Sequence, residues 1–124
     1  MNDQFIKPDD SLEIDPHFLD RLKELGGPKL ISELITMYLT RGSDLLDTIV
    51  AGIESQDFNS VKNAPHSLIS SAGNLGGKRV SKLSIAIEAA AMDEQIDILD
   101  ELKPDLILAQ DYFQHYLQGA FEQL

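Results

Sequence analysis

His66 is the residue whose type and setting could do chemistry. It follows Pro65 in the stretch APHSLISSAGNLGG, residues 64–77, and small side chains surround it in the sequence. Imidazole titrates near neutrality, so a neutral, nucleophilic nitrogen is available at cytoplasmic pH. A nucleophilic histidine can take up a phosphoryl group and later pass it on. His66 is therefore a candidate phosphoryl acceptor, to be weighed against the commoner case of an ordinary surface histidine.

The charge around His66 differs from that of the rest of the chain. The 124 residues carry a formal net charge of −11, yet no Asp or Glu occurs from Phe58 to Ile87. About five acids would be expected in a window of that length. We therefore expect no carboxylate near His66 that could act as a base, so a partner must supply the acid–base groups and any metal. The window does contain four cations, namely Lys62, Lys78, Arg79 and Lys82.

These cations are candidates for electrostatic roles. Lys62 lies one helical turn before His66, and it is the candidate for supporting the charge of a phosphoryl group. The other three are candidates for docking an acidic partner surface.

A helical wheel places His66 on the outside of its helix. At about 100° per residue, one stripe of residues 58–75 is apolar. It comprises Val61, Ala64, Pro65, Leu68, Ala72 and Leu75. His66 points about 150° away from the centre of this stripe. Ile69, Ser70 and Gly73 share its outward sector, and we expect them to form the contact surface for a partner.

The whole chain has helical periodicity. Apolar residues recur at alternating steps of three and four, and no useful length alternates with period two, so no sheet is expected. The helices are predicted at about 15–25, 28–55, 58–75, 78–92 and 94–124. Short connections between long helices predict antiparallel neighbours. We thus expect an all-α protein, an antiparallel up-and-down four-helix bundle over residues 15–124 with a short N-terminal covering helix, preceded by a flexible tail over residues 1–14.

Two prolines fall inside predicted helices. Pro65 removes the hydrogen bond to the carbonyl of Val61 and costs about 3 kcal/mol relative to alanine. Either the helix kinks and continues, or it breaks and Asn63 caps a new helix. We favour the kink, because the core stripe stays in phase on both sides of Pro65. Pro104 should kink the last helix in the same way.

Composition excludes several classes of function. There is no cysteine, so disulfides and thiolate metal sites are absent. The negative charge argues against nucleic acid and anionic membranes as partners. No apolar run reaches the roughly 20 residues of a membrane span. His17 and His115 have no metal-ligand spacing with His66. We expect a cytoplasmic, free-standing monomer without a metal or cofactor of its own.

The segment HSLISSAGNLGG resembles the signature of histidine-containing phosphotransfer (HPt) domains, whose pattern is A-H-x-L-K-G-x-A/S-G-x-L-G. The residues that match are His66, Leu68, Ala72, Gly73, Asn74, Leu75 and Gly76. The upstream segment, from Phe18 to Val61, is also typical of the family, so the resemblance extends over residues 15–124. It implies a four-helix bundle, phosphorylation of His66, and partners that are receiver domains of response regulators or hybrid sensor histidine kinases. Magnesium would be held by the receiver only.

Three positions depart from the family pattern. Ile69 stands where the family usually has lysine, Ser70 where it has glycine, and Pro65 where it has alanine. The missing lysine removes a cation beside the phosphoryl group, and Lys62 is the candidate to replace it. Two alternatives to a phosphocarrier follow. One is a degenerate HPt-like module that binds a receiver or kinase without carrying phosphate, and the other is a plain helical adaptor.

Overall fold

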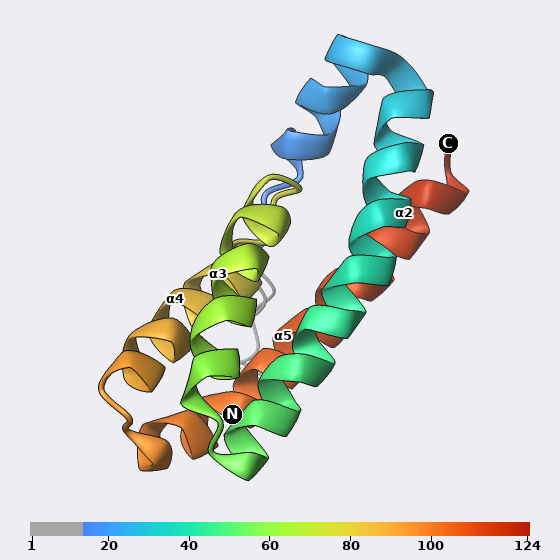
Figure 1. The fold of residues 1–124 in the computed structure, drawn as a ribbon. Coiled ribbons are helices and arrows are strands. Elements are labelled where there is room, and N and C mark those ends of the chain that lie inside the picture. The colour runs from blue at the N-terminus through green and yellow to red at the C-terminus, as the bar shows by residue number, and fades with distance from the viewer. Residues whose placement is uncertain (1–13) are drawn as a thin grey trace, which may run out of the picture.

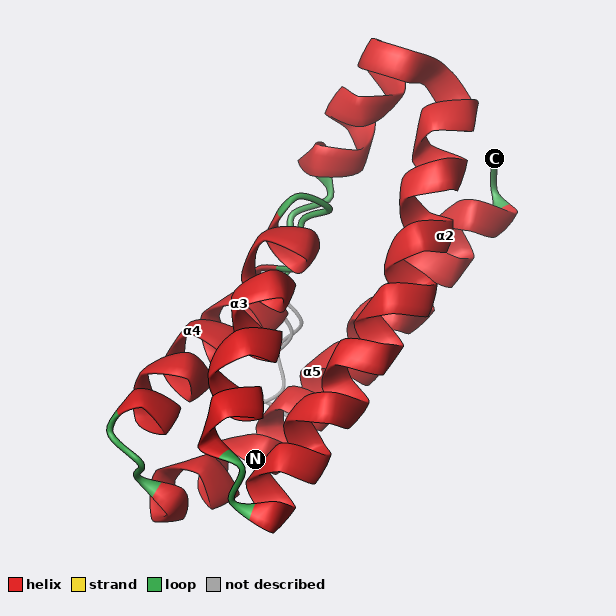
Figure 2. Cartoon of the chain, viewed as in Figure 1, coloured by secondary structure: helices red, strands yellow, loops and turns green. Residues whose placement is uncertain are grey.

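The computed structural model describes residues 14–124, and over this range every regular element is a helix (Figures 1 and 2). The helices are α2 (His17–Ser55), α3 (Phe58–Gly73), α4 (Lys78–Met92) and α5 (Ile96–Glu122). Each helix packs on its neighbour in the chain, and α5 returns to pack on α2. The result is the predicted antiparallel up-and-down bundle (Figure 1).

The first turns of α2 form the predicted short covering helix. Gly27 has φ 72° and ψ −169°, and this non-helical residue separates His17–Gly26 from the long part of α2. That conformation is essentially restricted to glycine. Figure 1 shows the short segment bent back at one end of the bundle. A backbone hydrogen bond of 2.8 Å from the Asp15 N–H to the Gly76 carbonyl fixes its start to the α3–α4 turn.

The start of this segment differs slightly from the prediction. The pair Asp15-Pro16 is typical of an N-cap followed by proline at the first helical position. The helix instead begins at His17, with Pro16 as the N-cap residue, and the Asp15 carboxylate accepts a 3.0 Å hydrogen bond from the His17 N–H. The apolar spacing of Phe18, Leu22 and Leu25 predicts one buried side for this segment, yet Leu25 is 80% exposed. The flexible tail predicted for residues 1–14 lies outside the described residues except for Ile14, which packs partly buried against the core.

Helix α3 runs without interruption through Pro65, so a break capped by Asn63 is ruled out. The N-cap is Asp57, whose side chain accepts hydrogen bonds from the Ser60 hydroxyl and backbone N–H. These hydrogen bonds hold the pKa of Asp57 below its usual value. Helix α5 likewise continues through Pro104. The proline ring of Pro65 is buried with the core stripe, so apolar packing offsets the hydrogen bond that it removes.

The core is formed by one face of each helix. All six residues of the predicted α3 stripe are buried, and they meet Ile35, Ile49, Ile87 and Phe113 from the other helices. At the α3–α4 turn, Gly77 lies under the Phe113 ring, where a Cβ atom would come within 2.5 Å of a ring carbon. This close contact requires glycine at Gly77, and it fixes the end of α3 relative to α5.

Candidate functional site

His66 lies in the middle of α3, and its side chain is 78% exposed. The buried stripe lies on the opposite face of the helix, so the backbone below the ring is held by the core. The predicted outward orientation is therefore confirmed. The arrangement places an accessible imidazole on a rigid helix.

A carboxylate lies beside this imidazole, contrary to the sequence prediction. The Oε2 atom of Glu88, in α4, is 3.0 Å from Nδ1 of His66. The expectation that no acid stands near the histidine was wrong. The acid-free window ends at Ile87, one residue before Glu88. Antiparallel packing of α3 and α4 brings together two residues that are 22 positions apart.

A second polar contact joins the same two helices one turn further along α3. The Ser81 hydroxyl donates a 2.8 Å hydrogen bond to the Ile69 carbonyl oxygen. Gly73 faces Ser81, and a Cβ atom at Gly73 would lie 3.5 Å from the Ser81 Oγ, an ordinary van der Waals distance. Ile69 and Gly73 are half-buried and Ser70 is exposed, so the predicted contact surface is accessible only in part.

The four cations of the acid-free window occupy different positions on α3 and α4 relative to His66 and Glu88. Lys62 is half-buried on the His66 face of α3, one turn before the histidine. Lys82 and Lys78 are exposed, but they precede Glu88 by six and ten residues, which is about 9 and 15 Å along α4. Arg79 precedes Glu88 by nine residues, a rotation of about 180°, so it faces away from α3. Of these cations, Lys62 is the nearest to His66 in the sequence, four residues before it on the same helix.

An apolar groove of about 590 Å³ begins on α3 one to two turns beyond His66. Ser71 and Asn74 form its α3 wall. The remaining walls come from the covering segment and the long part of α2, and they include Phe18, Arg21, Leu22, Leu25, Leu34, Met37 and Arg41. Leu25 is 80% exposed and Met37 is 63% exposed. The groove was not predicted from the sequence.

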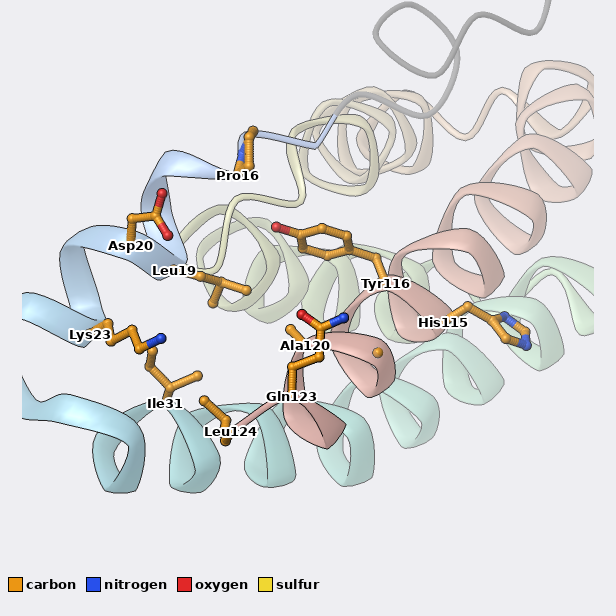
Figure 3. Close-up of a pocket in the computed structure, with 11 residues that line it drawn as sticks. Pro16, Leu19, Asp20, Lys23, Ile31, His115, Tyr116, Ala120, Gln123 and Leu124 are labelled. Atoms are coloured by element: carbon orange, nitrogen blue, oxygen red, sulfur yellow. The ribbon is translucent and has the colours of Figure 1, made fainter.

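A second hollow, of about 490 Å³, lies on the other side of the covering segment (Figure 3). Residues of that segment face the C-terminal turns of α5, where Gly119 and Ala120 line it. Tyr116 also lines it, and partial burial together with the Asp20 carboxylate raises the pKa of Tyr116. His115 contributes to its rim, and its Nδ1 is 3.6 Å from an Asp111 oxygen in the same helix. His17 is exposed at the start of α2.

Metal-binding groups and membrane-spanning helices were both looked for among the described residues. Among residues 14–124, no group of three or more His, Cys, Asp or Glu side chains could hold a metal ion. None of the helices in the same range is long and apolar enough to cross a membrane.

An up-and-down helical bundle that presents one exposed histidine at mid-helix is the architecture of a phosphotransfer module. The Hpt domain family matches residues 33–123, and the chain therefore belongs to the Hpt domain family. Its function is histidine phosphotransfer in a phosphorelay. The Hpt domain is a phosphocarrier rather than a catalytic domain, and such domains interact with receiver domains and kinases.

A solved structure has the same fold. It is histidine-containing phosphotransfer protein B (HptB) from Pseudomonas aeruginosa PAO1, which matches with a TM-score of 0.83. The match covers 90% of this chain and 96% of that chain, at 14% sequence identity. No curated protein matches the chain.

Proposed function

We propose that His66 is the residue that carries the phosphoryl group. The observation that supports this role is the position of the ring, 78% exposed at the centre of a helix whose opposite face is buried. His17 and His115 are also exposed, but each lies near a chain end of the bundle and outside the family motif. His66 occupies the motif position, and small side chains leave space for a partner to approach it.

The proposed reaction transfers one phosphoryl group between two carboxylates by way of the imidazole. A neutral ring nitrogen of His66 attacks the phosphorus of an aspartyl phosphate on a receiver domain. The P–N bond forms as the P–O bond breaks, and the electron pair leaves with the aspartate oxygen. The reverse step delivers the group to an aspartate of a second receiver. Magnesium is expected on the receiver only, and the HPt chain contributes no cofactor and no enzymatic activity of its own.

Lys62 is the proposed electrostatic support for the phosphoryl group. It projects from the same face of α3 as His66, at a spacing of four residues, which brings side chains on a helix into proximity. An ammonium group there offsets part of the negative charge that arrives with the phosphoryl group. Ile69, in the place of the family lysine, contributes apolar contact surface instead.

The partner is proposed to dock over His66 and along the adjoining groove. Arg21 and Arg41 flank apolar walls there, and this combination suits a partner surface with an apolar ridge and acidic neighbours. Ser70 and Gly73 would lie between the imidazole and the groove. Lys78 and Lys82 would contact the edge of the partner, whereas Arg79 lies on the far flank of α4. We further propose a monomeric, cytoplasmic protein.

Phosphorylation tests the proposal directly. The protein is mixed with a receiver domain phosphorylated by acetyl phosphate in the presence of Mg²⁺, and the products are scored for an acid-labile, alkali-stable adduct. We expect the adduct in the wild type and in His115→Gln, and its complete loss in His66→Gln. Binding without any adduct would indicate the non-phosphorylated docking module instead. Retention of the adduct in His66→Gln would show that another residue is the acceptor.

A further inference from the structure

One sulfur atom lies in the wall of the apolar groove beside α3. It belongs to Met37, which is 63% exposed although the next residue, Tyr38, is buried. Met37 also lines a second hollow, of about 500 Å³, whose walls all come from α2. The thioether therefore stands between two hollows and is open to small solutes from the solvent.

The chain offers few sulfur atoms to an oxidant. It contains no cysteine and three methionines, which are Met1, Met37 and Met92. Met92 is as open as Met37, at 66% exposed, but it ends α4 and does not line the groove. Oxidants convert an accessible methionine to its sulfoxide. Because Met37 and Met92 differ in position rather than in exposure, each serves as a control for the other.

The walls around Met37 combine apolar and cationic side chains. Leu25 and Leu34 contribute apolar surface, and Arg21 and Arg41 also line the groove. Arg41 follows Met37 by four residues, so the two side chains are neighbours on α2. A methionine is unbranched and polarizable, which lets it adapt to differently shaped surfaces. A phosphocarrier docks at least two different proteins, and an adaptable apolar side chain in the groove suits that task.

We infer that Met37 is an oxidation site whose sulfoxide weakens the docking of a receiver domain on the groove. This inference rests on the proposed docking of the partner over His66 and along the groove. Oxidation converts an apolar side chain into a polar one, and docking would bury the new oxygen against apolar surface. A buried acceptor without a donor disfavours the complex. His66 does not line the groove, so the imidazole itself is left unchanged.

The proposed oxidant is a hydroperoxide, of which hydrogen peroxide is the simplest. A lone pair of the Met37 sulfur attacks one peroxide oxygen, the S–O bond forms as the O–O bond breaks, and a proton shift releases water. The sulfur loses two electrons and the peroxide gains them. Methionine sulfoxide reductases reverse the modification. In that reaction the oxygen leaves as water while two thiols are oxidised to a disulfide, so the proposed modification is reversible.

The first test measures which methionine is oxidised and how oxidation changes docking. The full chain is treated with hydrogen peroxide, and peptide mass spectrometry reads the oxidation of each methionine. Affinity is then measured for the receiver domain that phosphorylates His66 in the test above. We expect Met37 and Met92 both to be oxidised, and the receiver to bind about 5-fold to 100-fold more weakly, as expected for one buried polar group without a partner. Methionine sulfoxide reductase should restore the affinity.

Matched variants assign the effect to one sulfur atom. Met37→Leu has no thioether in the groove, so its affinity for the receiver should be the same before and after peroxide. Met92→Leu is the matched control, and it should lose affinity on oxidation as the wild type does. Met37→Gln places a polar amide in the groove and should bind the receiver weakly without any peroxide.

A second test uses phosphoramidate as the donor, so that docking of a receiver plays no part. The oxidised wild type should be phosphorylated on His66 as fast as the reduced protein, and thermal melting should show that the oxidised bundle is folded. A fall in this rate on oxidation would overturn the inference, because the effect would then not be confined to docking.

The outcomes separate this inference from the proposed function. If the oxidised wild type binds the receiver as tightly as the reduced protein, Met37 is not a control point, and His66 remains the acceptor as long as His66→Gln abolishes the adduct. Protection by Met92→Leu instead of Met37→Leu would also refute the inference. If His66→Gln keeps the adduct, the proposed function itself fails.

Discussion

Two of the polar contacts between helices of this bundle serve different purposes. At the α3–α4 edge, His66 meets Glu88 in a contact that is open to solvent. Between α2 and α5, the Tyr38 hydroxyl donates a 2.6 Å hydrogen bond to Gln110 Oε1 within the core. The first contact lies where a partner can reach the imidazole, whose side chain is 78% exposed. The second has no access from outside and contributes only to the stability and register of the helices.

The buried contact has a cost that the exposed one avoids. Gln110 is fully buried, and its Nε2 has no hydrogen-bond partner among the described residues. A buried polar group without a partner costs about 1–3 kcal/mol. A Cβ atom at Gly42 would come within 2.9 Å of this nitrogen, so the amide is closely packed there. At the α3–α4 edge, by contrast, solvent satisfies whatever the protein leaves unpaired.

The largest expected effect comes from breaking the buried contact. Tyr38→Phe removes the hydroxyl and leaves both polar atoms of Gln110 without a partner, so it should lower the free energy of unfolding by about 1–3 kcal/mol. Urea denaturation measures the change. Phosphorylation of the folded variant by phosphoramidate should be as fast as in the wild type. A loss of phosphorylation without a loss of stability would show that the two contacts are not independent.

A double variant sharpens this result. Replacing both partners by apolar groups of similar shape can be nearly neutral, because no unpaired polar group remains. Tyr38→Phe combined with Gln110→Leu should therefore recover most of the stability that Tyr38→Phe loses. A double variant less stable than Tyr38→Phe would mean that Gln110 contributes through packing or through other bonds.

The pH dependence of stability gives a second way to separate the two regions. Burial raises the pKa of Tyr38 well above its ordinary value of 10.0. The unfolded chain then loses this proton at a lower pH than the folded chain, so stability is intact below pH 10 and declines as the pH rises above it. Denaturation midpoints between pH 8 and about 11.5 measure the decline. Tyr38→Phe should flatten it, and Tyr116, whose pKa is also raised, should account for a remainder.

Some features of these two regions could be predicted from the sequence and others could not, and the difference has a physical reason. The α3 stripe and the outward position of His66 follow from the helical period, which is a local property, and both predictions are confirmed. Glu88 was missed because its contact depends on the register of two helices, and that register is set by core packing rather than by spacing within either helix. Gln110 was missed because a polar residue type gives no sign of burial. The groove beside α3 depends on the bend at Gly27, whose angle no sequence pattern specifies.

A smaller effect is expected from changing the charge at the exposed edge. Lys62→Ala should slow transfer from a phosphorylated receiver about twofold to fivefold, which corresponds to the 1 kcal/mol or less that a solvent-exposed ion pair contributes. Receiver binding should weaken by less, because Lys62 supports the phosphoryl group rather than the interface. Lys103→Ala is the matched control, since Lys103 forms a 3.3 Å ion pair with Glu54 away from His66. Equal transfer rates for Lys62→Ala and Lys103→Ala would remove Lys62 from its proposed role.

The smallest expected effect tests whether transfer simply follows stability. Gly119 and Gly27 both have open space where a Cβ atom would lie, but only Gly27 has a positive φ, of 72°. Gly119→Ala should raise the free energy of unfolding by about 0.5–1 kcal/mol, because alanine favours the helix. Gly27→Ala should lower it by at least as much, because its backbone conformation is strained for any L side chain. Stopped-flow measurement of phosphorylation by phosphoramidate should give equal rates for both variants, since neither residue contacts the His66 edge. Rates that rise and fall with stability would mean that the α3–α4 edge is not preformed, and that the distinction between the exposed and the buried contacts does not hold.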